Sequence, residues 1–116
     1  MVTAQDLART LRARSERRRA RAEARAARLC GLLPEVKRLL IERHQAARVL
    51  LFGSLATGGY SETSDLDLAV EGLASDRYFH ALAELMAVVG GPVDLVRLEE
   101  AGPSLRTCIE EEGRSL

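Results

Sequence analysis

Three aspartates stand within otherwise apolar segments of this 116-residue chain. Asp65 and Asp67 lie one residue apart in SDLDLAV, and Asp94 lies in PVDLV. Side chains on a strand alternate between its faces, so the first two carboxylates share a face, with α-carbons about 6 to 7 Å apart. Such carboxylates can grip one divalent cation or a pair of them.

Burial makes a cation the natural partner of these carboxylates. An unpaired carboxylate among apolar residues is costly unless it reaches solvent, a cation or a hydrogen-bond donor. Three carboxylates together repel one another, and a bound divalent ion is the simplest way to keep them all charged at neutral pH. All-oxygen ligation favours Mg²⁺ or Mn²⁺ over zinc. We therefore predict that Asp65, Asp67 and Asp94 bind metal.

The segment FGSLATGGY offers a second chemical feature ahead of these aspartates. Gly53 permits close backbone approach, and Ser54 supplies a hydroxyl and an N–H at the start of a short helical turn, where phosphate oxygens bind well. Gly53 and Gly58 have P-loop spacing, but Gly59 and Tyr60 stand where Lys and Ser or Thr are required. Taken alone, a Gly-Ser pair is usually a turn, and an Asp-x-Asp is usually the polar face of a strand.

The elements that position these residues alternate between strand and helix. Apolar runs predict strands at 49–52, at the segment carrying Asp65 and Asp67, and at 93–98. Helical patterns predict helices at 3–30, 34–44, 76–89 and 104–112. Gly31 is expected to end the first of these helices, and Pro34 to lie in the first turn of the second. We therefore expect an α/β fold with a mixed sheet of three or more strands and packed helices.

Hydrophobic spacing predicts which helix faces are buried. The second helix presents Leu33, Val36, Leu39 and Leu40, and the third presents Phe79, Leu82, Ala83, Met86 and Val89 after a cap at Ser75 or Asp76. In the last helix, Leu105 and Ile109 should point inward. We expect His44 at the surface or in a cap, and His80 facing solvent.

The first 30 residues are rich in Arg, Ala and Glu, which favour a helix. Thr3 and Asp6 form a capping-box pattern. Few large apolar residues follow, so this helix should project from the body or fray. Its arginines have three interpretations: a solvated face, contact with an acidic protein or a second copy, or contact with phosphates.

Composition describes one domain with a single modest core, at 47% hydrophobic and 29% charged residues. Net charge is zero, but residues 1–48 hold 13 Lys and Arg against 5 Asp and Glu, whereas residues 49–116 hold 4 against 12. Aromatic residues are scarce at 3%, so we do not expect direct nucleic-acid binding. Cys30 and Cys108 suggest free cytosolic thiols, and without a membrane or signal segment we expect a cytoplasmic protein.

In combination, the two features resemble a known signature. Gly53-Ser54, ten intervening residues, Asp65-Leu66-Asp67 and the later Asp94 resemble the DNA polymerase β nucleotidyltransferase superfamily. Within it, the chain is similar to the minimal nucleotidyltransferases, which are paired with HEPN ribonuclease proteins in toxin–antitoxin modules. The resemblance covers about residues 34–116, including VDLVRLEE and SLRTCIEEEG, and leaves the Arg-rich segment outside.

This resemblance implies a function for each matching residue. Gly53 and Ser54 would bind the triphosphate of ATP, and Asp65 and Asp67 would bind two Mg²⁺ ions. Asp94 would complete the catalytic metal site and help to activate the attacking hydroxyl. The implied reaction is transfer of AMP from ATP to a tyrosine of a HEPN toxin, with which this antitoxin would assemble.

One position departs from the pattern of that family. Many relatives carry Arg where this chain has Thr57, which removes a cation near the expected phosphates. Arg48 and Arg77 are possible substitutes. We divide the chain into an Arg-rich helical extension at 1–30 and a minimal nucleotidyltransferase domain at 31–116.

Two other functions remain open. The same chemistry could act on tRNA ends or on a small hydroxylated molecule. Alternatively, the protein could neutralise a toxin by binding alone, with the Arg-rich helix as its docking arm.

Overall fold

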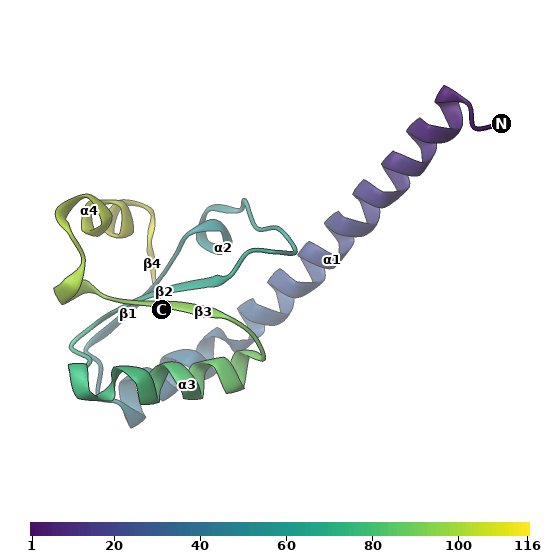
Figure 1. Cartoon of the computed structure of the whole chain (residues 1–116). Coiled ribbons are helices and arrows are strands. Elements are labelled where there is room, and N and C mark those ends of the chain that lie inside the picture. Colours follow the sequence, from purple (N-terminus) through teal and green to yellow (C-terminus); the bar gives the residue numbers. More distant parts are fainter.

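A four-stranded mixed sheet forms the centre of the computed structural model, which describes residues 1–116 (Figure 1). Its strands are β1 (Arg48–Phe52), β2 (Leu66–Glu71), β3 (Val93–Arg97) and β4 (Arg114–Ser115), in the order β3-β2-β1-β4. Strand β1 is antiparallel to β2 and β4, while β2 and β3 are parallel. The predicted α/β fold with a mixed sheet is confirmed. The short, polar β4 was not predicted.

Helices cover both faces of this sheet. They are α1 (Ala4–Arg38), the π-helical turn η1 (Leu39–Arg43), α2 (Ser54–Thr57), the 3-10 turn η2 (Ser75–Arg77), α3 (Tyr78–Val89), the 3-10 turn η3 (Leu98–Glu100) and α4 (Pro103–Glu112). Helices α1 and α3 lie on one face and α4 on the other (Figure 1). The larger core lies on the α1/α3 side and includes Leu51, Leu68 and Leu85, whereas the α4 side has a small cluster around Ile109. No helix combines the length and apolar character needed to cross a membrane.

The predicted break between two N-terminal helices is wrong, because α1 runs without interruption through Gly31 and Pro34. Both residues lie on the exposed side of the helix, where water can satisfy the carbonyl that the proline leaves without a donor. On the opposite side, Leu29, Leu33 and Val36 are buried in the core. Packing of this continuous stripe outweighs the local signals for termination.

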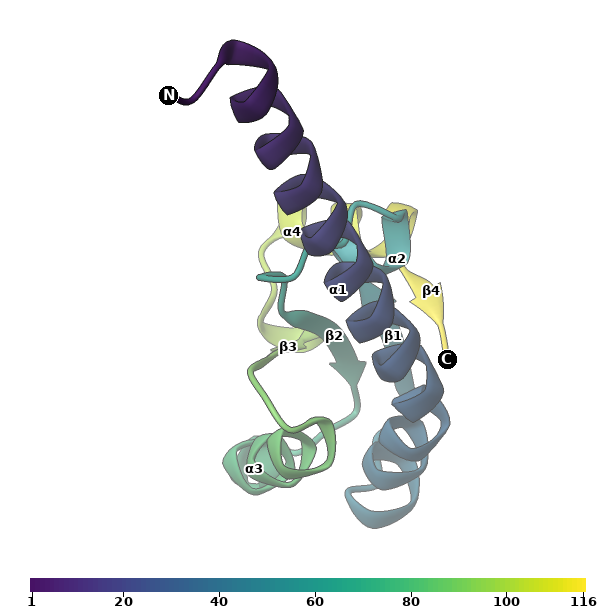
Figure 2. The same ribbon diagram turned by 90° about the vertical axis from the view of Figure 1, so that its right-hand side faces the viewer.

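The part of α1 that precedes Ala22, residues 4–21, projects beyond the sheet as an arm (Figures 1 and 2). The molecule consequently extends to 62 Å along its longest axis, against 29 and 20 Å along the others. The prediction that the helix of residues 3–30 projects from the body is confirmed for this part, whereas Leu29 is buried in the core. The predicted capping box is present, with the Asp6 amide donating to Thr3 Oγ1 and the Thr3 amide donating to the Asp6 carboxylate. Ala22 is the first buried residue of the chain.

The predicted buried face of α3 is wrong for Phe79, Ala83 and Met86, which are exposed. Val89 is buried as predicted, and Leu82 is partly buried against the core. Ala81 and Leu85 are buried although they were not predicted to be. The expected cap at Ser75 or Asp76 makes no side-chain bond, and the turn η2 precedes the helix instead. In α4, Ile109 is buried as predicted but Leu105 is 41% exposed.

The prediction that His44 lies at the surface is also wrong, since only 3% of it is exposed. Its Nε2 lies 3.2 Å from Glu84 Oε2 of α3. This contact arises because η1 continues α1 below the sheet, where the side chain meets α3. His80 lies on the outside of α3 as predicted, paired with the same glutamate at 3.0 Å. Cys30 and Cys108 are free and exposed.

Candidate functional site

Asp67 and Asp94 occupy neighbouring positions on the parallel strands β2 and β3. Adjacent strands lie about 4.8 Å apart, and residues in register direct their side chains to the same face. That face is the one that carries α4, because the alternate residues Leu66 and Leu68 are buried in the α1/α3 core. Asp65 directly precedes β2, so the prediction that it lies within this strand is wrong.

The negative charges of Asp65 and Asp94 act on the carboxylate of Asp67. Partial burial raises the pKa of Asp67 above its usual 3.8, and the negative charges of Asp94 and Asp65 raise that pKa further. Asp65 and Asp94 are themselves exposed. A partly buried carboxylate with two negative neighbours is where a bound cation gains most.

Gly53 lies against this cluster for two separate reasons. Its φ of +74° is a backbone conformation that L side chains rarely adopt. In addition, a Cβ at this position would overlap the carboxylate of Asp67. Because Phe52 is paired with Asp67 across β1 and β2, the strand end delivers Gly53 directly to the aspartate.

The short helix α2 begins at Ser54, as predicted, with Gly53 as its N-cap. The carbonyl of Gly53 accepts bonds from the amides of Ala56 and Thr57, both at 3.1 Å. It also accepts the Thr57 hydroxyl at 3.2 Å. Thr57 therefore stabilises the turn and supplies no cation to the site.

Neither proposed substitute for the missing arginine reaches this site. Arg48 lies at the opposite end of β1 and pairs with Glu71 and Glu110. Arg77 donates to the carbonyl of Arg43 at 3.3 Å, beside the start of α3. Arg48 therefore pairs at the far end of the sheet, and Arg77 joins the turn η2 to the turn η1.

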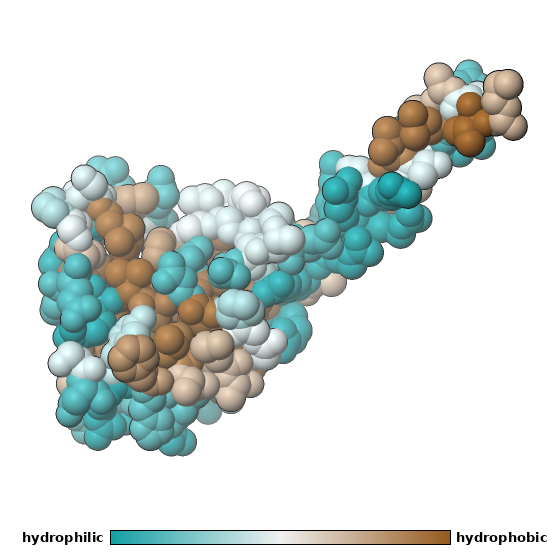
Figure 3. Space-filling model, in the orientation of Figure 1, coloured by the Kyte–Doolittle hydropathy of each residue, from teal (hydrophilic) through white to brown (hydrophobic).

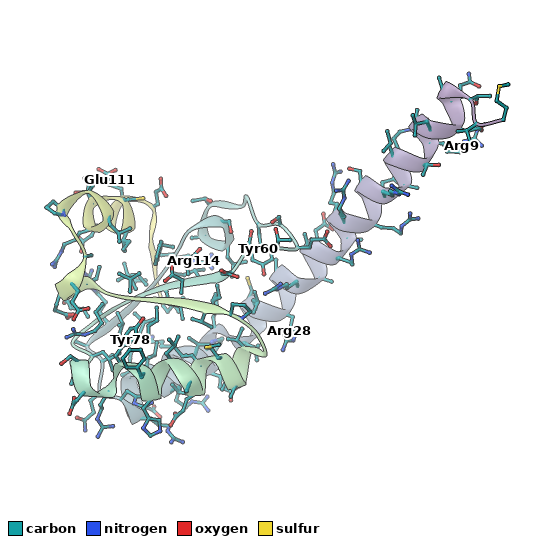
Figure 4. The ribbon with its side chains drawn as sticks, viewed as in Figure 1. Arg9, Arg28, Tyr60, Tyr78, Glu111 and Arg114 are labelled. Carbon is teal, nitrogen blue, oxygen red and sulfur yellow. The ribbon has the colours of Figure 1, made fainter.

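The cations nearest to the loop between α2 and β2 come instead from α1. Arg21 pairs with Glu62 at 2.9 Å, and Arg25 donates to the Glu62 carbonyl at 3.0 Å. Tyr60 lies at this junction (Figure 4). The pKa of Tyr60 is raised, mainly by burial. The positive charge of Arg25 partly offsets this rise, and the negative charge of Asp65 adds to it. Helix α1 therefore passes beside the loop that leads from α2 to Asp65.

The sequence did not reveal this contact. The bonds from Arg21 and Arg25 to Glu62 span 41 and 37 residues. Nothing in the local pattern of the Arg run distinguishes these two arginines from their neighbours. The continuation of α1 through Gly31 and Pro34 sets the direction of the arm, and it was the helix break that misled the prediction.

The oxygen donors of the three aspartates suit a hard cation, although their side chains are not arranged as a preformed metal site. No group of three or more His, Cys, Asp or Glu side chains is arranged closely enough to hold a metal ion. The backbone nevertheless brings Asp67 and Asp94 into register, and Asp65 is close enough to perturb the pKa of Asp67. Three carboxylates with only oxygen donors fit Mg²⁺ chemistry.

Comparison with known proteins gives concordant matches. The family model described as polymerase beta nucleotidyltransferase matches residues 35–116. A relative from Methanocaldococcus jannaschii, named as a putative protein adenylyltransferase, is 29% identical over 87 residues, which cover 70% of this chain and 87% of that protein.

Two solved structures extend the comparison. One, described as a putative minimal nucleotidyltransferase, superposes with a TM-score of 0.65 at 33% identity, covering 76% of this chain and 95% of the other. A second, from a toxin–antitoxin complex named MntA-HpeT, has a TM-score of 0.62 at 26% identity, covering 72% and 69% of the two chains.

Proposed function

The chain belongs to the polymerase beta nucleotidyltransferase family, and from that membership we propose that it transfers AMP from ATP to a tyrosine hydroxyl of a HEPN-type ribonuclease toxin, as the antitoxin of the pair. A relative named for protein adenylyltransfer and a neighbour from a toxin–antitoxin complex support this acceptor class. The observation that carries the proposal is the pairing of Asp67 with Asp94 directly beside Gly53.

Each site residue has a role in this reaction. Gly53 leaves space for the Asp67 carboxylate, and Ser54 would bind phosphate oxygens at the start of α2. Asp65, Asp67 and Asp94 would hold two Mg²⁺ ions, which align phosphates and offset charge on them. Asp67 and Asp94 lie at paired positions of β2 and β3, which favours a defined geometry.

The bonding changes follow from nucleotidyl transfer. The acceptor oxygen forms a bond to the α-phosphorus of ATP as the bond from that phosphorus to the β-phosphate oxygen breaks. Pyrophosphate leaves, and the hydroxyl proton passes to a carboxylate, for which exposed Asp94 is the candidate. The product is a tyrosine joined to AMP by a phosphodiester.

A mass measurement tests the proposal. The protein is incubated with ATP, Mg²⁺ and the co-expressed partner protein, and the partner is then weighed. We expect AMP-sized additions to the partner with the wild type and none with Asp65→Asn or Asp67→Asn. Asp76→Asn, which removes an exposed aspartate from the distant turn η2, is the matched control and should retain transfer.

The same experiment separates catalysis from neutralisation by binding. If the partner is neutralised equally by the wild type and by Asp65→Asn, without any added mass, the protein acts by binding and the catalytic proposal fails. Additions on a tRNA or a small hydroxylated molecule, in place of the protein, would keep the chemistry and replace the acceptor.

A further inference from the structure

A hollow of about 570 Å³ lies between α1 and the loop that joins α2 to β2. From α1 it is lined by Arg18, Arg19, Ala22 and Glu23, and from the loop by Gly58, Tyr60, Ser61, Glu62 and Thr63. Its volume falls within the range of about 300 to 1,000 Å³ typical of small-molecule sites. Its walls come from segments about 40 residues apart in the chain, so it exists only when the arm is in place.

Two guanidinium groups in this hollow have no partner in the structure. Arg18 and Arg19 are exposed, and neither makes a hydrogen bond or ion pair, whereas the neighbouring Arg21 is paired with Glu62. That pairing neutralises one of the two acidic residues lining the hollow. The local charge is therefore positive, with donors available to an anion.

A buried hydroxyl in the same wall also lacks a partner. Tyr60 lines the hollow, and its hydroxyl oxygen is buried without any hydrogen bond. Buried polar groups are nearly always paired. The hydroxyl has almost no accessible surface, so a bound anion would reach it only after a rearrangement of the Tyr60 side chain.

The hollow adjoins the candidate active site. Gly58 is the C-cap of α2, and Gly53 is its N-cap. The four residues between them span only about 6 Å of helix. At the other end of the loop, the charge of Asp65 acts on the Tyr60 hydroxyl. An anion bound near Ser54 therefore has a short path to the hollow.

We propose that Arg18 and Arg19 of the arm bind the outer phosphates of the nucleoside triphosphate in the hollow that Tyr60 helps to line. This inference rests on the proposed function for the identity of the nucleotide. It makes the arm a part of the substrate site, although residues 1–34 lie outside the matched family region. The released pyrophosphate would make the same contacts with Arg18 and Arg19.

Paired arm variants test the assignment in the full-length protein. R18A/R19A removes the two unpaired arginines, and R9A/R12A removes two arginines from the outer arm that do not line the hollow. All four side chains are exposed, so neither variant should alter folding. Calorimetric titrations use ATP, AMP and inorganic tripolyphosphate, each with Mg²⁺.

We expect R18A/R19A to weaken binding of ATP and tripolyphosphate by about tenfold, the loss of charge-assisted bonds, and to leave AMP binding unchanged. R9A/R12A should bind all three like the wild type. Equal binding of tripolyphosphate by the wild type and both variants would overturn the inference, even if AMP transfer continues. So would R18A/R19A losing partner modification while keeping full ATP affinity, which would make the hollow an acceptor contact.

The two proposals fail separately. If tripolyphosphate binding depends on Arg18 and Arg19 but no acceptor ever gains AMP, the anion site stands and the proposed function falls. If transfer occurs and R18A/R19A matches the wild type throughout, the function stands and the arm has no part in substrate binding.

Discussion

The outer and inner parts of α1 share one helix but differ in what stabilises it. Leu11 and Leu29 are 18 residues apart in sequence, which is about five helical turns, so both lie on the same face. Leu11 is 51% exposed and Leu29 is 1% exposed. The outer part has its capping box and good helix formers, whereas the inner part is packed against the sheet.

Surface character follows the same division. Large apolar residues at the tip of the arm, including Leu7 and Leu11, are exposed, and an arginine-rich stretch separates them from the body (Figure 3). Helix formation and burial are therefore independent properties of this one continuous element. Four substitutions test that distinction, in order of decreasing effect.

Leu29→Ala should lower the free energy of unfolding by about 3 kcal/mol, because it leaves a cavity in the core. Leu11→Ala makes the same chemical change on the same face and should alter it by less than about 0.5 kcal/mol. Urea denaturation measures both. Equal losses would mean that the arm is packed in solution and that the two parts of α1 do not differ.

Gly53→Ala should cost roughly 2 kcal/mol, because the new Cβ imposes strain at positive φ. The new Cβ also overlaps the Asp67 carboxylate. AMP transfer should therefore fall by more than the loss of stability alone explains. Gly59→Ala is the matched control, since a Cβ there meets nothing within 4 Å. Full transfer activity in Gly53→Ala would contradict the close approach of Gly53 to Asp67.

Thr3→Ala removes the capping box and should cost about 1 kcal/mol of local helix stability. Because the first turn has no contact with the sheet, the denaturation midpoint of the body should not change. Hydrogen exchange of the amides of residues 4–10 should accelerate while those of β1 stay protected. Faster exchange in β1 would show that arm and body unfold together.

Asp67→Asn should stabilise the protein slightly at neutral pH, by less than about 1 kcal/mol because the group is partly solvated. The raised pKa of Asp67 means that its charge opposes folding once the pH exceeds the folded pKa. Below the usual value of 3.8, the carboxyl is neutral in both states and the difference from Asn should vanish. Chemical denaturation at neutral and acidic pH checks the sign, and a lower stability of Asp67→Asn at pH 7 would contradict it.

Local patterns predicted the strands well and the helix faces less well. The alternation around Asp67 indicated a strand with Leu66 and Leu68 directed to the core, as observed. Helix α3 is apolar on most sides, so periodicity did not specify which face packs. The face of α3 that packs depends on the positions of α1 and the sheet. In the folded protein Ala81 and Leu85 are buried, whereas Phe79 and Met86 are exposed.

Long-range neighbours were harder to predict for the same reason. His44 is buried only because Glu84, 40 residues later, lies opposite it. Likewise, the contact of Arg25 with Glu62 depends on the direction of α1. That direction could not be predicted, because Gly31 and Pro34 wrongly indicated a break in the helix. Local propensities contain no information about such pairs.

Local sequence was enough to predict the shared face of Asp67 and its strand, the Gly-Ser turn and the capped N-terminal helix, because strand alternation and capping depend on residues only a few positions apart. Tertiary structure alone decided that β2 and β3 pair in the register that sets Asp94 beside Asp67, and that the arm runs past Tyr60. Sheet pairing and helix docking depend on burial summed over distant segments, and only the folded chain brings those segments together.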